Sequence, residues 1–63
     1  MKRRDLLKTL KAEAKARGVE MEVVEGGNHT KVIIGDVQTV VPRHNEINEI
    51  TARAILKQMG VDR

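Results

Sequence analysis

The first apolar residues of the chain recur with the period of an α-helix. Residues three or four positions apart would line one face of a helix over residues 3–17, namely Leu6, Leu7, Leu10 and Ala14. Asp5 would stand in the first turn, where a carboxylate interacts favourably with the helix dipole. Gly18 follows the last turn and is a candidate C-terminal cap.

Three short segments after this helix have the pattern of β-strands. Apolar and charged residues alternate over residues 19–23, as in a half-buried strand. A run rich in β-branched residues occupies 30–34, and a third segment, 37–41, ends before Pro42. The segments are separated by two turn signals, Gly26-Gly27 and Gly35-Asp36. Glycine in each pair can supply the positive φ that a two-residue hairpin requires.

These turns predict the pairing of the strands, with Glu25 opposite Asn28 and Ile34 opposite Val37. Paired residues share a face of the sheet. One face would then carry Val19, Met21, Val23, Thr30, Val32, Ile34, Val37, Thr39 and Val41. The other would carry Glu20, Glu22, Val24, His29, Lys31, Ile33, Gln38 and Val40. The first face is the predicted core.

A second helix is predicted from about Glu49 to Met59. Asn48 is its candidate N-cap, and Gly60 its end. The expected apolar face consists of Ile50, Ala54, Ile55, Leu56 and Met59. The fold class is therefore α+β, in the order αβββα, with a three-stranded antiparallel sheet and two helices on one face. We expect a single domain, 1–63, whose small core favours association with a second chain.

Composition narrows the classes of partner. The chain has 12 Lys and Arg against 9 Asp and Glu, and its pI near 9.7 favours anionic partners, although many small proteins are basic. It has no aromatic residue on which bases could stack, which argues against a single-strand binder of the OB or RRM kind. It has no cysteine, no apolar run of membrane length and no signal peptide, so we expect a cytoplasmic protein without a membrane partner.

The predicted topology brings both histidines to one end of the sheet. His29 opens the second strand opposite Pro42, and His44 lies two residues beyond. Both helices would begin at this end, and helix N-termini favour anions. The residues expected to hold phosphate there are Lys2, Arg3, Arg4, Lys31 and Arg43, beside a backbone turn of Gly26, Gly27 and Asn28. We expect neither a metal nor a cofactor, because two histidines 15 positions apart have no third ligand at an obvious spacing.

An imidazole changes charge near neutral pH, so His29 could accept a proton from a ribose 2′-OH or donate one to the leaving 5′-oxygen. His44 could assist, or could bond a nearby backbone carbonyl. Each feature has a simpler interpretation: a polar residue at a strand start for His29, turn chemistry for Gly26-Gly27, and a solvated helix start for 2–4.

Four blocks of the chain resemble one known family. They are Met1-Lys-Arg-Arg-Asp-Leu-Leu, Gly26-Gly-Asn-His-Thr, Val41-Pro-Arg-His-Asn-Glu-Ile-Asn and Ala54-Ile-Leu-Lys-Gln-Met-Gly. In this order they resemble the HicA (YcfA-like) toxins of toxin–antitoxin systems, and the second and third blocks are the specific ones. The resemblance implies a fold like the double-stranded-RNA-binding domain and a ribosome-independent mRNA interferase, with the family's essential histidine at His29.

The resemblance also implies a HicB-type antitoxin that covers the active site, with much of its contact on the first helix and the sheet. The expected assemblies are a homodimer or a heterotetramer with the antitoxin. The chain departs from its relatives in a shortened connection at Gly35-Asp36, in the lack of an aromatic after the histidine block, and in a longer first helix. The competing hypotheses are a non-catalytic RNA-binding module and a protein whose sheet edge or first helix docks a partner.

Overall fold

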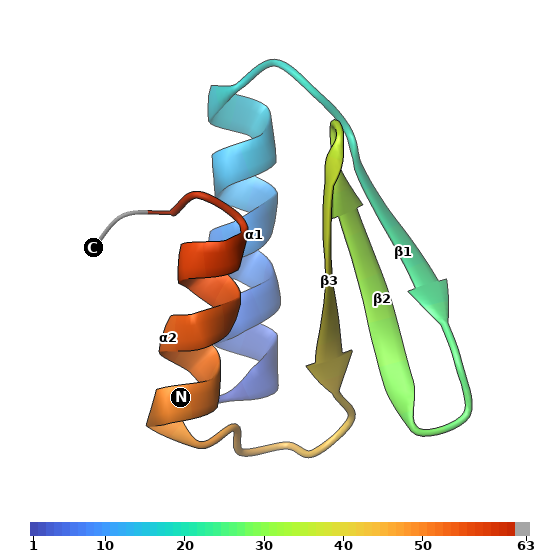
Figure 1. Ribbon diagram of the computed structural model, residues 1–63, viewed down its shortest axis with the longest axis vertical. Coiled ribbons are helices and arrows are strands. Elements are labelled where there is room, and N and C mark those ends of the chain that lie inside the picture. Colours follow the sequence, from blue (N-terminus) through green and yellow to red (C-terminus); the bar gives the residue numbers. More distant parts are fainter. Residues whose placement is uncertain (62–63) are drawn as a thin grey trace.

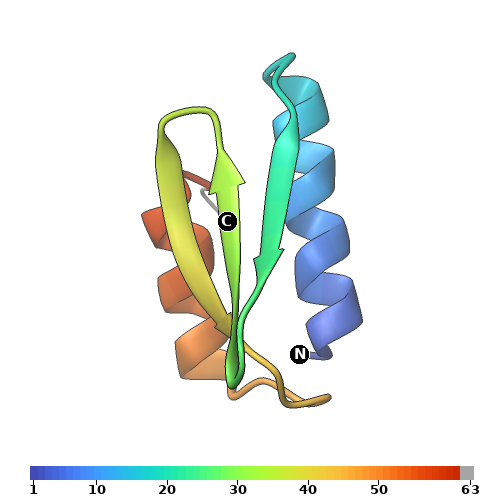
Figure 2. The same ribbon diagram turned by 90° about the vertical axis from the view of Figure 1, so that its right-hand side faces the viewer.

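The computed structural model describes residues 1–61 and contains the five elements in the expected order (Figure 1). They are α1 (Arg3–Ala16), β1 (Met21–Glu25), β2 (His29–Ile34), β3 (Val37–Pro42) and α2 (Glu49–Gln58). The strands form one antiparallel sheet in the order β1-β2-β3, and both helices cover the same face of it (Figure 2). The predicted α+β class and αβββα order are confirmed. Neither helix among residues 1–61 is long and apolar enough to cross a bilayer.

The caps of both helices agree with the sequence. Gly18 has a φ of 72°, and the backbone N–H of Val19 donates to the carbonyl of Ala14 over 3.0 Å, which closes the end of α1. At the start of α2, the Asn48 side chain accepts a hydrogen bond from the backbone N–H of Ile50 over 2.8 Å. These contacts fix where α1 ends and where α2 begins.

The hairpin of β2 and β3 has the predicted register. Ile34 lies opposite Val37 around Gly35, whose φ is 61°. The residues of these strands that face the helices are buried, except Val37, which is partly buried. Lys31 and Val40 on the other face are exposed. The core consists of Leu6, Leu10, Ala14, Val32, Ile34, Val41, Ile47, Ala52, Ile55, Met59 and Val61.

The register predicted for β1 and β2 is wrong by two residues. Glu25 lies opposite Thr30 instead of Asn28, and neither Gly26 nor Gly27 has a positive φ. Gly26 instead lies against His29, whose carbonyl accepts a hydrogen bond from the Gly26 N–H over 2.8 Å. Because side chains alternate with a period of two, a shift of two residues leaves every residue on its predicted face.

The expected contribution of β1 to the core is confirmed only for Met21, which is partly buried and packs against the core. The strand begins at Met21, and Val19 and Val23 remain 39% and 42% exposed. β1 is an edge strand of the sheet. α2 packs against β3 at the opposite edge, so the helix that covers β1 is α1 (Figure 1).

The predicted apolar face of the second helix is correct for Ile55, Leu56 and Met59 and wrong for Ile50 and Ala54. Ile50 is 79% exposed and Ala54 is exposed, whereas Ala52 and Ile55 are buried. The cause is Ile47, three positions before Ile50, which is only 3% exposed and occupies the core just ahead of the helix. Its N–H donates to the carbonyl of Met1 over 2.7 Å, so the chain enters α2 at a fixed angle.

Candidate functional site

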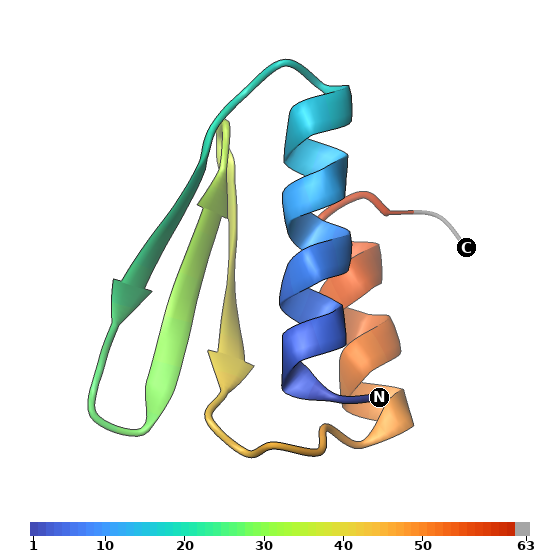
Figure 3. The ribbon, with the colours of Figure 1, turned by 180° about the vertical axis from the view of Figure 1, so that it is seen from behind.

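One end of the sheet brings together the end of β1, the start of β2, the end of β3 and the first turns of both helices (Figure 3). Backbone contacts join the segment before α2 to the start of α1. The Arg3 N–H donates to the carbonyl of Asn45 over 2.9 Å, and Lys2 and Glu46 form an isolated antiparallel β-bridge. The predicted gathering of helix N-termini and histidine-bearing segments is thus observed.

His29 opens β2 on the face turned away from the helices. It pairs with Pro42, its side chain is exposed, and no side-chain hydrogen bond within residues 1–61 involves it or His44. Lys31 is exposed two positions further along the same face, about 7 Å from His29 along the strand. The open face therefore presents an accessible imidazole with a cation beside it.

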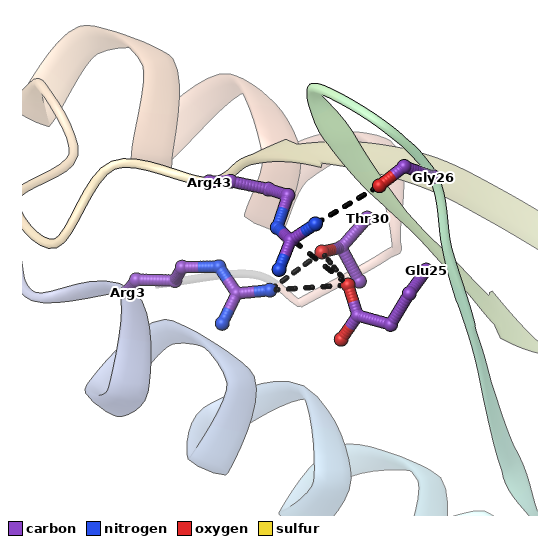
Figure 4. Close-up of polar contacts among 5 residues, drawn as sticks. All are labelled: Arg3, Glu25, Gly26, Thr30 and Arg43. Carbon is purple, nitrogen blue, oxygen red and sulfur yellow. Dashed lines mark hydrogen bonds and ion pairs between the residues drawn. The ribbon is translucent and has the colours of Figure 1, made fainter.

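The helical face of the same end carries a compact polar cluster (Figure 4). Glu25 accepts a hydrogen bond from the Thr30 hydroxyl over 2.7 Å, and Thr30 in turn accepts one from the Arg3 guanidinium. Both Arg3 and Arg43 lie 3.9 Å from the same Glu25 oxygen. Thr30 is fully buried, and these bonds satisfy its hydroxyl.

This cluster divides the predicted phosphate-binding residues into two groups. Arg3 and Arg43 lie on the helical side with Glu25, whose negative charge offsets part of theirs. Lys31 lies on the open face, while Lys2 and Arg4 are exposed at the start of α1. Sequence reasoning missed Glu25, because the predicted register placed it opposite Asn28 instead of Thr30.

Arg43 connects this cluster to the histidine loop. Its guanidinium donates to the carbonyl of Gly26 over 3.0 Å, and the N–H of Gly26 donates to the carbonyl of His29. Gly27 and Asn28 complete the loop and are exposed. A chain of contacts thus runs from Glu25 through Arg43 and Gly26 to the backbone of His29, so the polar cluster positions the loop that carries the imidazole.

Gly26 and Gly27 should respond in opposite ways to alanine. A Cβ on Gly26 would lie 2.9 Å from the carbonyl oxygen of His29, whereas one on Gly27 would meet nothing within 4 Å. We expect Gly26→Ala to lower the free energy of unfolding by about 1–3 kcal/mol, as overpacking does. Gly27→Ala should raise it by up to about 1 kcal/mol, because alanine restricts the unfolded chain. Urea denaturation followed by circular dichroism measures both, and equal effects would contradict the assigned contact.

The polar side chains of the site do not form a metal-binding arrangement. Within residues 1–61, no group of three His, Asp or Glu side chains is placed to hold a metal ion. The exposed imidazole of His29 can accept or donate a proton, and the ammonium group of Lys31 lies on the same face of the sheet.

A relative with a known name shares most of the chain. The protein is 45% identical over 49 residues to the probable mRNA interferase HicA 2 of Photorhabdus laumondii, covering 75% of this chain and 81% of the relative. The chain belongs to the HicA family. No family model and no solved structure matches it. The resemblance to the HicA family is thereby confirmed.

Proposed function

We propose that this protein is the toxin of a toxin–antitoxin pair and acts as an endoribonuclease on mRNA. The observation that carries the proposal is the 45% sequence identity, over 49 residues, to a HicA relative named as a probable mRNA interferase. The exposed histidine at the open end of the sheet supports it, because an RNA strand can reach this side chain without any rearrangement of the core.

In the proposed reaction the ribose 2′-oxygen attacks the adjacent phosphorus. The bond between that oxygen and phosphorus forms, and the bond from phosphorus to the 5′-oxygen of the next nucleotide breaks. His29 takes the proton of the 2′-OH or supplies the proton to the 5′-oxygen, with His44 assisting in the other transfer. Nucleophile and leaving group both belong to RNA, so the reaction needs no metal, and acid–base catalysis of this kind contributes about 10²–10⁴-fold.

The cations take two roles in this proposal. Lys31 lies on the face of His29 and stabilises the charge that develops on the phosphate. Arg43 holds the histidine loop through Gly26, and Arg43 and Arg3 both lie 3.9 Å from Glu25, which ends the strand before that loop. Lys2 and Arg4 add positive charge at the first turn of α1, where the helix dipole also favours an anion.

The protein partner in this proposal is a HicB-type antitoxin that covers the site until RNA cleavage is required. Covering an exposed imidazole and its loop needs only a surface that excludes RNA, not one that alters the fold. Salt-dependent RNA binding by antitoxin-free protein, with no strand scission, would instead identify a binding module without chemistry.

Digestion of a defined RNA by the purified protein tests the proposal. We expect cleavage that persists in EDTA and leaves one product with a 2′,3′-cyclic phosphate, or its hydrolysed form, and the other with a 5′-hydroxyl. Mass spectrometry of the fragments identifies both ends. A 5′-phosphate product or a requirement for Mg²⁺ would refute the proposed attack by the 2′-oxygen.

A further inference from the structure

Four cations form an exposed stripe along α1. Arg4, Lys8, Lys11 and Lys15 are separated by four, three and four positions and are all exposed. At about 100° per residue they fall within about 60° of the helix circumference, and at about 1.5 Å per residue the stripe is about 16 Å long. We refer to these four residues as the basic stripe.

The basic stripe is not neutralised by neighbouring carboxylates. Within residues 1–61, Lys8, Lys11 and Lys15 take part in no ion pair, and Arg4 has only an exposed contact of 3.9 Å with Asp5. Like charges four positions apart destabilise a helix, and the stripe contains two such pairs. A helix needed only for packing would gain by placing a carboxylate at one of these positions, which favours a role for the charge itself.

One end of the stripe lies next to the proposed catalytic end of the molecule. Arg4 stands in the first turn of α1, at the end of the sheet where β2 begins with His29, and Lys15 stands in the last turn. α1 runs alongside the sheet and away from that end (Figure 3), and the four exposed side chains of the stripe follow it.

We propose that the basic stripe binds consecutive phosphates of the RNA strand whose cleavage site lies at His29. This inference rests on the proposed function and adds the path of the substrate. Lysine is depleted in the centres of protein–protein interfaces, which rely on apolar and aromatic anchors. Lysine and arginine dominate contacts with nucleic-acid phosphates, and the stripe has no aromatic side chain to contribute stacking. The grip is therefore electrostatic and independent of RNA sequence.

The test compares two double variants that each remove two positive charges. The stripe variant combines Lys11→Gln and Lys15→Gln. The control variant makes the same i,i+4 change on the exposed side of α2, by combining Arg53→Gln and Lys57→Gln. Both are made in a His29→Ala background, so that affinity for a short unstructured RNA is measured without cleavage. Circular dichroism checks that each variant keeps its helices, which glutamine supports about as well as lysine.

We expect the stripe variant to lose about 10- to 30-fold in RNA affinity at about 0.1 M salt. The slope of log K against log salt should become shallower by about 1.4, or about 0.7 for each lost phosphate contact on a single strand. The α2 variant should change affinity less than threefold.

Equal losses in both variants would show a general effect of net charge and overturn the proposal. Unchanged affinity in the stripe variant would also overturn it and leave an acidic protein surface as the partner for the stripe. Because binding is measured without catalysis, either result stands whether or not His29 cleaves RNA.

Discussion

Replacing His29 with alanine is expected to abolish RNA cleavage and leave the fold intact. The rate should fall by about 10²–10⁴-fold, the contribution of a positioned acid or base. The side chain is exposed and makes no hydrogen bond among residues 1–61, so its removal costs the core nothing. The backbone bond from Gly26 to the carbonyl of residue 29 is available to alanine as well.

His44→Ala is the matched control for this variant, since it removes a second exposed imidazole from the same end of the sheet. We expect a smaller loss, because His44 lies outside the loop held by Arg43. Initial rates on a defined RNA, with melting temperatures measured in parallel, separate loss of chemistry from loss of fold. If the His29 variant cut RNA at the native rate, the assigned mechanism would be wrong.

The largest effect on stability is expected from Ile55→Ala. Ile55 is 4% exposed in the core, and truncation of a buried isoleucine to alanine costs about 2–5 kcal/mol. A chain of 63 residues has a total stability of about 3–9 kcal/mol. The variant should therefore be substantially unfolded under conditions in which the native protein is folded.

Ile50→Ala removes the same atoms from the same helix and serves as the control. Ile50 lies about 140° around the helix from Ile55 and is 79% exposed, so its truncation should change stability by less than about 0.5 kcal/mol. Far-UV circular dichroism during urea denaturation suits a chain without aromatic residues. Comparable losses in the two variants would show that α2 is not oriented as described.

The sequence predicted best where local chemistry leaves a single solution. Gly35 permits a tight turn, so the register of β2 and β3 followed directly from its position. Asn48 had a helix to cap and no competing role. The apolar stripe of α1 was equally clear, because Leu6, Leu10 and Ala14 share one face and charged residues occupy the other.

The sequence predicted less well where tertiary packing chooses between similar patterns. Apolar residues occur almost all round α2, so its own sequence supports more than one buried face. Ile47, outside the helix, selects the face that carries Ala52 and Ile55. Exposure of Val23 follows from the edge position of β1, which alternation of apolar and polar residues cannot reveal.

The predicted gathering of the candidate site residues at one end of the sheet is observed, but their division between its two faces was not predicted. Topology alone placed His29 and most of the cations at one end of the sheet. It could not show that Arg3 and Arg43 converge on Glu25, because this depends on a register two residues away from the expected one. The role of Gly26 also differs, since glycine is needed there for a close approach to His29 and not for a left-handed conformation.

The central position of β2 also determines how the sheet opens. β2 is paired on both sides, so its amides exchange with solvent only when the hairpin itself separates, whereas β1 has one paired edge and little cover. His29 is the first residue of β2, the strand that we expect to open last. The loop before it, residues 26–28, joins β2 to β1, the strand that we expect to open first. Separation of β1 therefore leaves His29 in a strand that is still paired with β3, so the backbone that carries the imidazole does not depend on the edge strand.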